Sequence, residues 1–139
     1  GIEGGLTLAD TVFFAGQLKA IGVDLIDCSS GGLAKPAVAN ATVTPSYGYQ
    51  VGFAETVRRE ANIPTMAVGL IVDPHQAEDI IQQGQSDLVA LAREILANPN
   101  WPFMAQAELE GEADYSAWPT QMGWWLENRA LRLGRGAGK

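Results

Sequence analysis

Two short segments of the sequence combine residue types that suit the binding of a phosphate group. Val68-Gly69-Leu70 and Leu91-Ala92-Arg93-Glu94 each stand at the end of an apolar run of strand length. If the two runs are adjacent strands, the amides around Gly69, the first amides of a helix near Arg93 and the Arg93 guanidinium converge on one point. The alternative stays open that Gly69 is a turn glycine and that Arg93 forms a structural salt bridge.

A third candidate segment, Cys28-Ser29-Ser30-Gly31-Gly32, follows an earlier apolar run. Its small polar residues permit a flat ligand to approach the backbone closely. We interpret Cys28 as a small buried hydrophobic residue and not as a nucleophile, because no base is near it in the sequence and the single histidine, His75, is 47 positions away. One Cys and one His also leave no protein-only zinc site, so we predict that the chain binds no metal.

The composition excludes several classes of function. The chain has 139 residues and a net charge of −7. This is the sum of −11 for residues 1–128 and +4 for residues 129–139. An acidic body argues against a nucleic-acid partner, because duplex binding depends on neutralising phosphates. No apolar run approaches the roughly 20 residues of a membrane helix. We therefore expect no membrane contact and a reducing, cytoplasmic setting.

Three apolar runs, at 23–28, 65–71 and 87–92, predict strands that are covered on both faces. Helix signals precede and separate these runs. Thr7 and Asp10 have the spacing of a capping box and predict a helix that ends near Gly22.

Three further helices are expected between and after the strands. One is predicted over 49–61, where Asn62 can adopt the left-handed conformation that ends a helix. The next begins at Asp73-Pro74 and ends at Gly84, and the last starts near Arg93. Tyr47 and Tyr49 stand just before the second helix, where they either line a ligand pocket or fix the loop.

The alternation of helices and strands predicts an α/β architecture with a parallel sheet. The long loop 29–46 leaves the C-terminal end of the first strand, which is the functional rim of α/β proteins. Three strands cannot close a barrel, and a (β/α)8 barrel needs about 250 residues. The chain is therefore either an open three-stranded layer or the second half of a barrel. Since it does not begin with Met, we expect it to be part of a longer protein.

Several ordered blocks of the sequence resemble the Old Yellow Enzyme family, in particular its bacterial thermophilic-like branch. The resemblance covers about residues 5–121, in family order and spacing. The blocks that carry it are GVDLIDCSSGG at 22–32, YQVGFAE at 49–55, AVGLI at 67–71, GQSDLVALARE at 84–94, NPNWP at 98–102 and WPTQ at 118–121.

This resemblance implies that the chain is the C-terminal part, about strands 6–8, of a (β/α)8 TIM barrel that holds FMN without a covalent bond. The implied activity is an NAD(P)H oxidoreductase whose flavin reduces the activated C=C bond of an enone-type substrate. Residues 1–126 would form this half of the flavin-binding barrel, and residues 127–139 would form a basic C-terminal tail.

The cofactor-binding residues that the resemblance implies are Gly69, Ala92 and Arg93 around the FMN phosphate, and Ser29, Ser30 and Gly31 beside the flavin. Two positions depart from the family: Ala92 stands where Gly is usual, and Met122 replaces a usual Tyr. The hydride-transfer residues of the family lie upstream of this sequence. We therefore expect no catalytic residue in this chain and no ene reduction by the chain alone.

The expected partners are the missing N-terminal half of the barrel, or another copy of the chain, together with a small enone-type substrate. We also expect a homo-oligomer. A rival hypothesis is a non-enzymatic α/β fragment that acts as an assembly module through its open sheet edges. A third hypothesis keeps the barrel but replaces FMN by another phosphorylated ligand.

Overall fold

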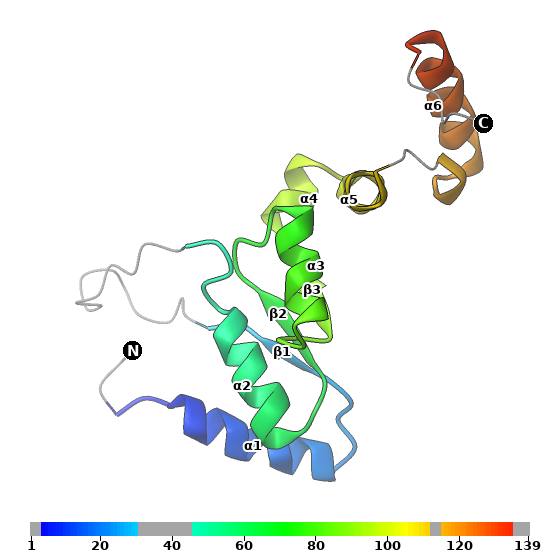
Figure 1. Cartoon of the computed structure of the whole chain (residues 1–139). Helices are drawn as coiled ribbons and strands as arrows, with labels where there is room; N and C mark the ends of the chain where they lie inside the picture. Colours follow the sequence, from blue (N-terminus) through cyan, green and yellow to red (C-terminus); the bar gives the residue numbers. More distant parts are fainter. Residues whose placement is uncertain (1–3, 31–45, 112–114, 135–139) are drawn as a thin grey trace. The chain divides into compact units, whose positions relative to one another are not determined.

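Three parallel strands form the one sheet among the residues that the computed structural model describes, which are 4–30, 46–111 and 115–134 (Figure 1). They are β1 (Ile26–Cys28), β2 (Thr65–Val68) and β3 (Leu88–Ala90), and they are hydrogen-bonded side by side in sequence order. Cys28 pairs with Ala67, and Val68 pairs with Ala90. The prediction of an α/β architecture with a parallel sheet is confirmed.

The first helix begins with the predicted capping box. In α1 (Leu8–Ala20) the Asp10 amide donates to the Thr7 hydroxyl at 3.2 Å, and the Thr7 amide donates to the Asp10 carboxylate at 2.8 Å. Both bonds satisfy amides that have no partner inside the helix. The Asp10 carboxylate also accepts the Thr7 hydroxyl at 2.7 Å, and this bond, with that from the Thr7 amide, lowers the pKa of Asp10.

The second helix, α2 (Val51–Ala61), ends as predicted at Asn62, which has a φ of 50°. The Lys19 ammonium donates to the Asn62 carbonyl and so ties α1 to the end of α2. α2 packs on β1 and β2, and α1 packs on α2 (Figure 1). Apolar side chains of α2, of the sheet and of the segment between them are buried, among them Val51, Ala54, Val57, Ile63 and Ala67. This burial fixes the turn before α2 against the sheet.

The chain divides into two compact units, which we describe separately. The first comprises Gly1–Val72 and Gln76–Ala92 and contains the sheet, and the second comprises Asp73–His75 and Arg93–Lys139. The helix α3 (Pro74–Gln82) follows β2, and Gly84 just after it has a φ of 67°. The remaining elements belong to the second unit: α4 (Arg93–Ala97), α5 (Trp101–Glu110), the 3-10 turn η1 (Tyr115–Ala117) and α6 (Thr120–Arg132).

The strands are shorter than the apolar runs that predicted them. β2 ends at Val68, because Gly69 and Leu70 have φ angles of 125° and 51° and cannot continue an extended strand. The second helix also begins at Val51 and not at Tyr49, since residues 47–50 form a turn. The sequence analysis divided the chain between residues 126 and 127. This position lies inside α6, which is continuous from Thr120 to Arg132.

Candidate functional site

The segments after β2 and β3 leave the sheet next to each other. The two strands are parallel neighbours, and the last residue of each, Val68 and Ala90, are paired. Gly69 follows directly on one strand, and Leu91 and Ala92 follow on the other. The adjacency on which the predicted phosphate site depends is therefore present.

The backbone at Gly69 requires a glycine for two reasons. Its φ of 125° is a conformation that L side chains rarely adopt. A Cβ built there would also lie 3.0 Å from Tyr49 Cε1 and 3.1 Å from Gln50 Nε2. Leu70 then continues with a positive φ, an uncommon conformation for a residue with a side chain. Backbone strain of this kind is frequent at ligand-binding turns.

The turn before α2 lies against this glycine. The Gly48 amide donates to the Gly69 carbonyl at 2.9 Å, and the Tyr49 ring lies in contact range of Gly69. Tyr47 is 72% exposed, so it does not pack in the same way. Of the two interpretations of these tyrosines, the structure favours fixation of the loop for Tyr49.

One buried glutamine side chain connects the ends of β1 and β2. Gln50 is only 3% exposed, and its Oε1 accepts hydrogen bonds from the Ser30 amide and from the Ser30 hydroxyl, the latter at 2.9 Å. Its Nε2 donates to the Val68 carbonyl at 3.4 Å. Sequence reasoning assigned no role to Gln50. It lies four and seven residues before Ala54 and Val57, so a polar residue on the buried face of a helix was the available signal.

The residues after β1 are partly described. Ser29 and Ser30 are exposed at the end of the strand, and the predicted site residue Gly31 lies outside the described residues. Cys28 is buried, and burial together with the nearby Asp27 carboxylate raises the pKa of its thiol. A thiol that resists ionisation is a poor nucleophile, which agrees with its interpretation as a small hydrophobic residue.

Arg93 is the first residue of α4, as the sequence predicted, and it follows Ala92 directly. The helix has only five residues. So few aligned peptide groups give a weak helix dipole, and the positive charge of this segment is chiefly that of the Arg93 guanidinium.

The opposite end of the sheet is closed by an ion pair. Arg58 Nε and Nη2 donate to the two oxygens of Asp87 at 2.9 and 3.1 Å, and Arg58 Nη1 donates to the Gly84 carbonyl at 3.1 Å. The Asp87 carboxylate also accepts the amide of buried Thr65 at 2.9 Å. The hydrogen bonds from Arg58, with that from Thr65, lower the pKa of Asp87. This network joins α2 to the starts of β2 and β3, and the sequence analysis did not find it.

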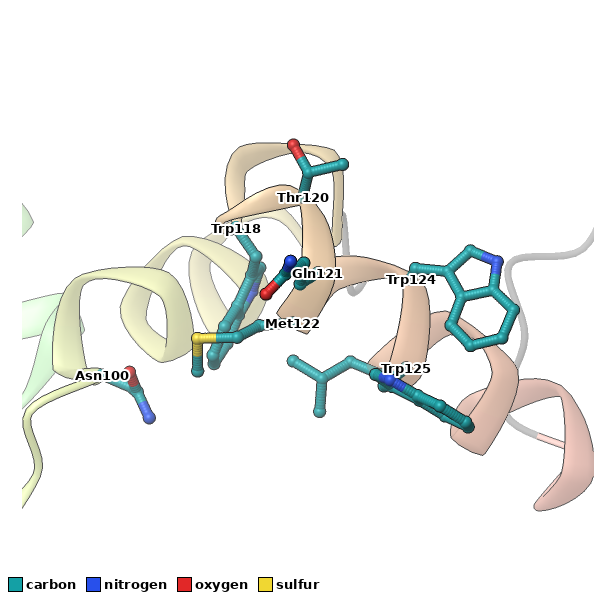
Figure 2. A pocket seen from close by; sticks show the side chains of 8 residues that line it. Asn100, Trp118, Thr120, Gln121, Met122, Trp124 and Trp125 are labelled. Carbon is teal, nitrogen blue, oxygen red and sulfur yellow. The ribbon is translucent and has the colours of Figure 1, made fainter.

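The second unit contains an apolar hollow of about 890 Å³ around the start of α6 (Figure 2). Figure 2 shows Met122 toward Trp118, while Trp124 and Trp125 project farther along α6. The rings of Trp124 and Trp125 meet edge to face with centroids 4.5 Å apart, and both side chains are exposed. Trp118 also stacks on Phe103 of α5. Arg93, the predicted cofactor-binding residue of this unit, does not line the hollow.

Other chemistry has little support in the part of the chain that the structure describes. There, no three His, Cys, Asp or Glu side chains gather in a way that would hold a metal ion. His75 is an exposed residue of α3, with Nε2 3.7 Å from a carboxylate oxygen of Glu108. None of the described helices has the length and apolar character needed to cross a membrane.

The family model and the relatives that match this chain point to the same family of proteins. A model of the NADH:flavin oxidoreductase / NADH oxidase family matches residues 1–112. The NADPH dehydrogenase of Geobacillus sp. (strain WCH70) is 56% identical over 105 residues, which are 76% of this chain and 29% of that protein. Those of Bacillus licheniformis and Bacillus subtilis are 50% identical over 119 residues and 46% identical over 108 residues, covering 82% and 78% of this chain.

The chain spans about a third of the length of these curated relatives, since the matches cover 29%, 34% and 30% of them. The resemblance seen in the sequence is thus found again, over most of the chain and at high identity. This chain belongs to the NADH:flavin oxidoreductase / NADH oxidase family.

Proposed function

We propose that this chain forms the FMN-binding C-terminal part, strands 6–8, of a (β/α)8 barrel that uses NAD(P)H to reduce activated C=C bonds of enone-type compounds. Residues 1–126 make up this part, and residues 127–139 follow as a basic tail. The chain supplies the phosphate end of the flavin site and no catalytic residue, so it is inactive alone. The complete enzyme is a cytoplasmic homo-oligomer, a setting with which the unpaired, buried Cys28 agrees.

One observation carries the proposal: the glycine turn after β2 leaves the sheet beside the segment after β3. Barrels commonly bind phosphate with the loops after their last two strands. FMN and NAD(P)H are the cofactors of the family to which the chain belongs. The Gly69 turn fits such a ligand, because Gly69 and Leu70 both have positive φ angles and backbone strain of this kind is frequent at ligand-binding turns.

The roles of the individual residues follow from their chemistry. Gly69 and the amides of Ala92 and Arg93 offer N–H groups to the phosphate, and the Arg93 guanidinium adds a charge-assisted contact. Ser29, Ser30 and Gly31 line the flavin at the end of β1. When bound, FMN supplies the capacity to accept a hydride and pass it on.

Exposed apolar side chains support the view that further barrel elements cover this chain. Leu88 in β3 is 51% exposed, although strands of a closed barrel are covered on both faces. Phe13 and Phe14 on α1 are also exposed. We propose that the upstream strands and helices of the barrel cover these positions.

The same exposed side chains and the open edges of β1 and β3 also favour the rival function, an assembly module without cofactor. A barrel portion that binds a different phosphorylated ligand is the third hypothesis. Flavin absorbance in the complex purified with its upstream half supports the first hypothesis. A colourless, stable oligomer supports the second.

A chimeric barrel tests the proposal. The segment of the Geobacillus NADPH dehydrogenase that matches this chain is replaced by the chain itself, and FMN, riboflavin and 2-cyclohexenone reduction are measured. We expect tighter binding of FMN than of riboflavin, together with NADPH-dependent reduction of the enone.

In this chimera, Arg93→Ala should weaken FMN binding about 10- to 100-fold, because one charge-assisted contact is worth about 1.5–3 kcal/mol. Riboflavin binding should not change. Arg59→Ala is the matched control, since Arg59 is exposed and pairs only with Glu60 among the described residues. Equal FMN affinity of the parent chimera and Arg93→Ala contradicts the proposal.

A further inference from the structure

The ends of β1 and β2 extend beyond the part of the sheet that holds them together. The ladder between these strands stops at the pair Cys28 and Ala67. Ser30 and Gly69 both lie past this last pair, so sheet hydrogen bonds between β1 and β2 do not set their spacing. Another group must position the two segments if they are to form one binding site.

The Gln50 side chain occupies the place where such a group is needed. It comes from the residue just before α2, whose packing on the sheet is fixed by buried Ala54 and Val57. Its carbonyl oxygen accepts two hydrogen bonds from Ser30, and its amide nitrogen donates to the Val68 carbonyl, one residue before Gly69. One side chain therefore bonds both segments beyond the ladder.

The chemistry of glutamine suits this position closely. A carboxamide has an acceptor and a donor on opposite sides, which match the Ser30 donors and the Val68 acceptor. A glutamate of the same length lacks the donor, and a methionine of similar length lacks both groups. Gln50 is 3% exposed, so leaving its side-chain amide without partners would be costly.

We propose that Gln50 is a positioning residue that holds the Ser30 segment and the Gly69 turn at the spacing required to bind one ligand along both strand ends. The ligand in question, a phosphorylated flavin, rests on the function proposed above. Gln50 does not contact the ligand itself. It acts by holding Ser30 and Val68 in place. Its removal should loosen the Ser30 segment and impair recognition of the phosphate by the Gly69 turn.

The test uses the full 139-residue chain and the variant Gln50→Met. Hydrogen exchange of the Ser30 amide is measured first, without ligand. Loss of one hydrogen bond of about 1 kcal/mol should accelerate this exchange about fivefold. Ser86→Ala is the matched control, because Ser86 is 2% exposed and donates to the Thr65 and Leu88 carbonyls at the other end of the sheet. It should leave Ser30 exchange unchanged.

The second measurement is the ratio of FMN to riboflavin affinity, made in the chimeric barrel that carries this chain. In Gln50→Met this preference for FMN should fall about five- to tenfold, whereas a loss of stability without a change of position would lower both affinities alike. Ser86→Ala should retain the wild-type ratio. Unchanged Ser30 exchange, or an unchanged FMN preference, in Gln50→Met overturns the inference.

Gln50→Glu separates the two connections and serves if Gln50→Met does not fold. Its carboxylate still accepts from Ser30 but cannot donate to Val68, so Ser30 exchange should remain slow while the FMN preference falls. Fast Ser30 exchange in Gln50→Glu contradicts the assigned contacts. If the parent chimera shows no FMN preference while Gln50→Met accelerates Ser30 exchange in the 139-residue chain, the proposed function fails and the connection between the strand ends is supported.

Discussion

The two ends of the sheet differ in the way they are stabilised. At the starts of β2 and β3, Arg58 and Asp87 form a two-point ion pair that also satisfies the amide of buried Thr65. At the opposite end, β2 turns away through two residues with positive φ, and the Gln50 side chain bonds it to Ser30, which follows β1. The end with Arg58 and Asp87, which we call the closed end, has its polar groups paired with one another. The other end, which we call the open end, has a strained backbone at Gly69 and Leu70 and small exposed residues, Ser29 and Ser30.

This difference indicates that the two ends of strands only three or four residues long have different roles. Interactions that satisfy each other leave nothing to bind a ligand, so the Arg58 end stabilises the fold. A glycine turn next to exposed serines keeps backbone groups accessible, at a cost in local stability. Function at the C-terminal ends of parallel strands is the general rule for this architecture.

The largest expected effect is on the closed end. Asp87→Ala removes the acceptor of the buried Thr65 amide and both carboxylate contacts of Arg58, and should lower the free energy of unfolding by about 2 kcal/mol. The ion pair itself contributes little of this, because both side chains are partly exposed. Urea unfolding followed by circular dichroism measures the change.

The control for Asp87→Ala is Glu60→Ala, which removes an exposed ion pair with Arg59 and should change stability by less than about 0.5 kcal/mol. The FMN preference of the chimeric barrel should survive Asp87→Ala as long as the variant remains folded. A loss of that preference would show that the two ends do not have separate roles.

The second prediction concerns the open end. Gly69→Ala places a Cβ 3.0 Å from Tyr49 and 3.1 Å from Gln50, at a φ of 125°, and should cost about 1–2 kcal/mol of stability. Gly52→Ala provides a matched control: Gly52 lies inside α2 with open space around it, so the added methyl should stabilise the chain by up to about 1 kcal/mol. Thermal and urea unfolding measure both. Equal effects of the two substitutions would remove the case for strain at Gly69.

The smallest effect is the pH dependence of the closed end. The folded-state pKa of Asp87 is lowered from 3.8, chiefly by the hydrogen bonds from Arg58. Its contribution to stability is therefore present above about pH 4 and is lost as the pH falls through the folded pKa. Asp10 acts in the same direction, because its pKa is also lowered.

We expect the urea concentration at the unfolding midpoint of the wild-type chain to decrease as the pH is lowered below about 4. The decrease should be smaller in Asp87→Asn. Asp10→Asn serves as the comparison that isolates the capping box of α1. If Asp87→Asn and the wild-type chain lose stability in parallel on acidification, the ion pair does not hold the closed end.

Local signals predicted much of this fold. The capping box at Thr7 and the left-handed stop at Asn62 depend on residues three positions apart or fewer, and both appear as expected. The parallel sheet followed from three apolar runs between helices. The ends of the strands were less predictable, because the positive φ of Leu70 has no signature in residue type.

The connections between distant residues could not be read from the sequence. Arg58 and Asp87 are 29 positions apart, and Gln50 and Ser30 are 20 positions apart. Only the packing of α2 on the sheet brings each pair together. The roles of Gly69, Ala92 and Arg93 remain predictions, while the strand adjacency that they require, which was a condition of the sequence argument, is present.

The distribution of aromatic residues gives the chain a built-in optical label. All four tryptophans, at 101, 118, 124 and 125, belong to the second unit, whereas Tyr47 and Tyr49 belong to the first. Fluorescence excited at the red edge of the absorption band thus monitors the second unit alone, and far-ultraviolet dichroism monitors the helices of both. Superimposable melting curves from the two methods would mean that the units come apart as one cooperative block, and separated curves would mean that each has its own transition.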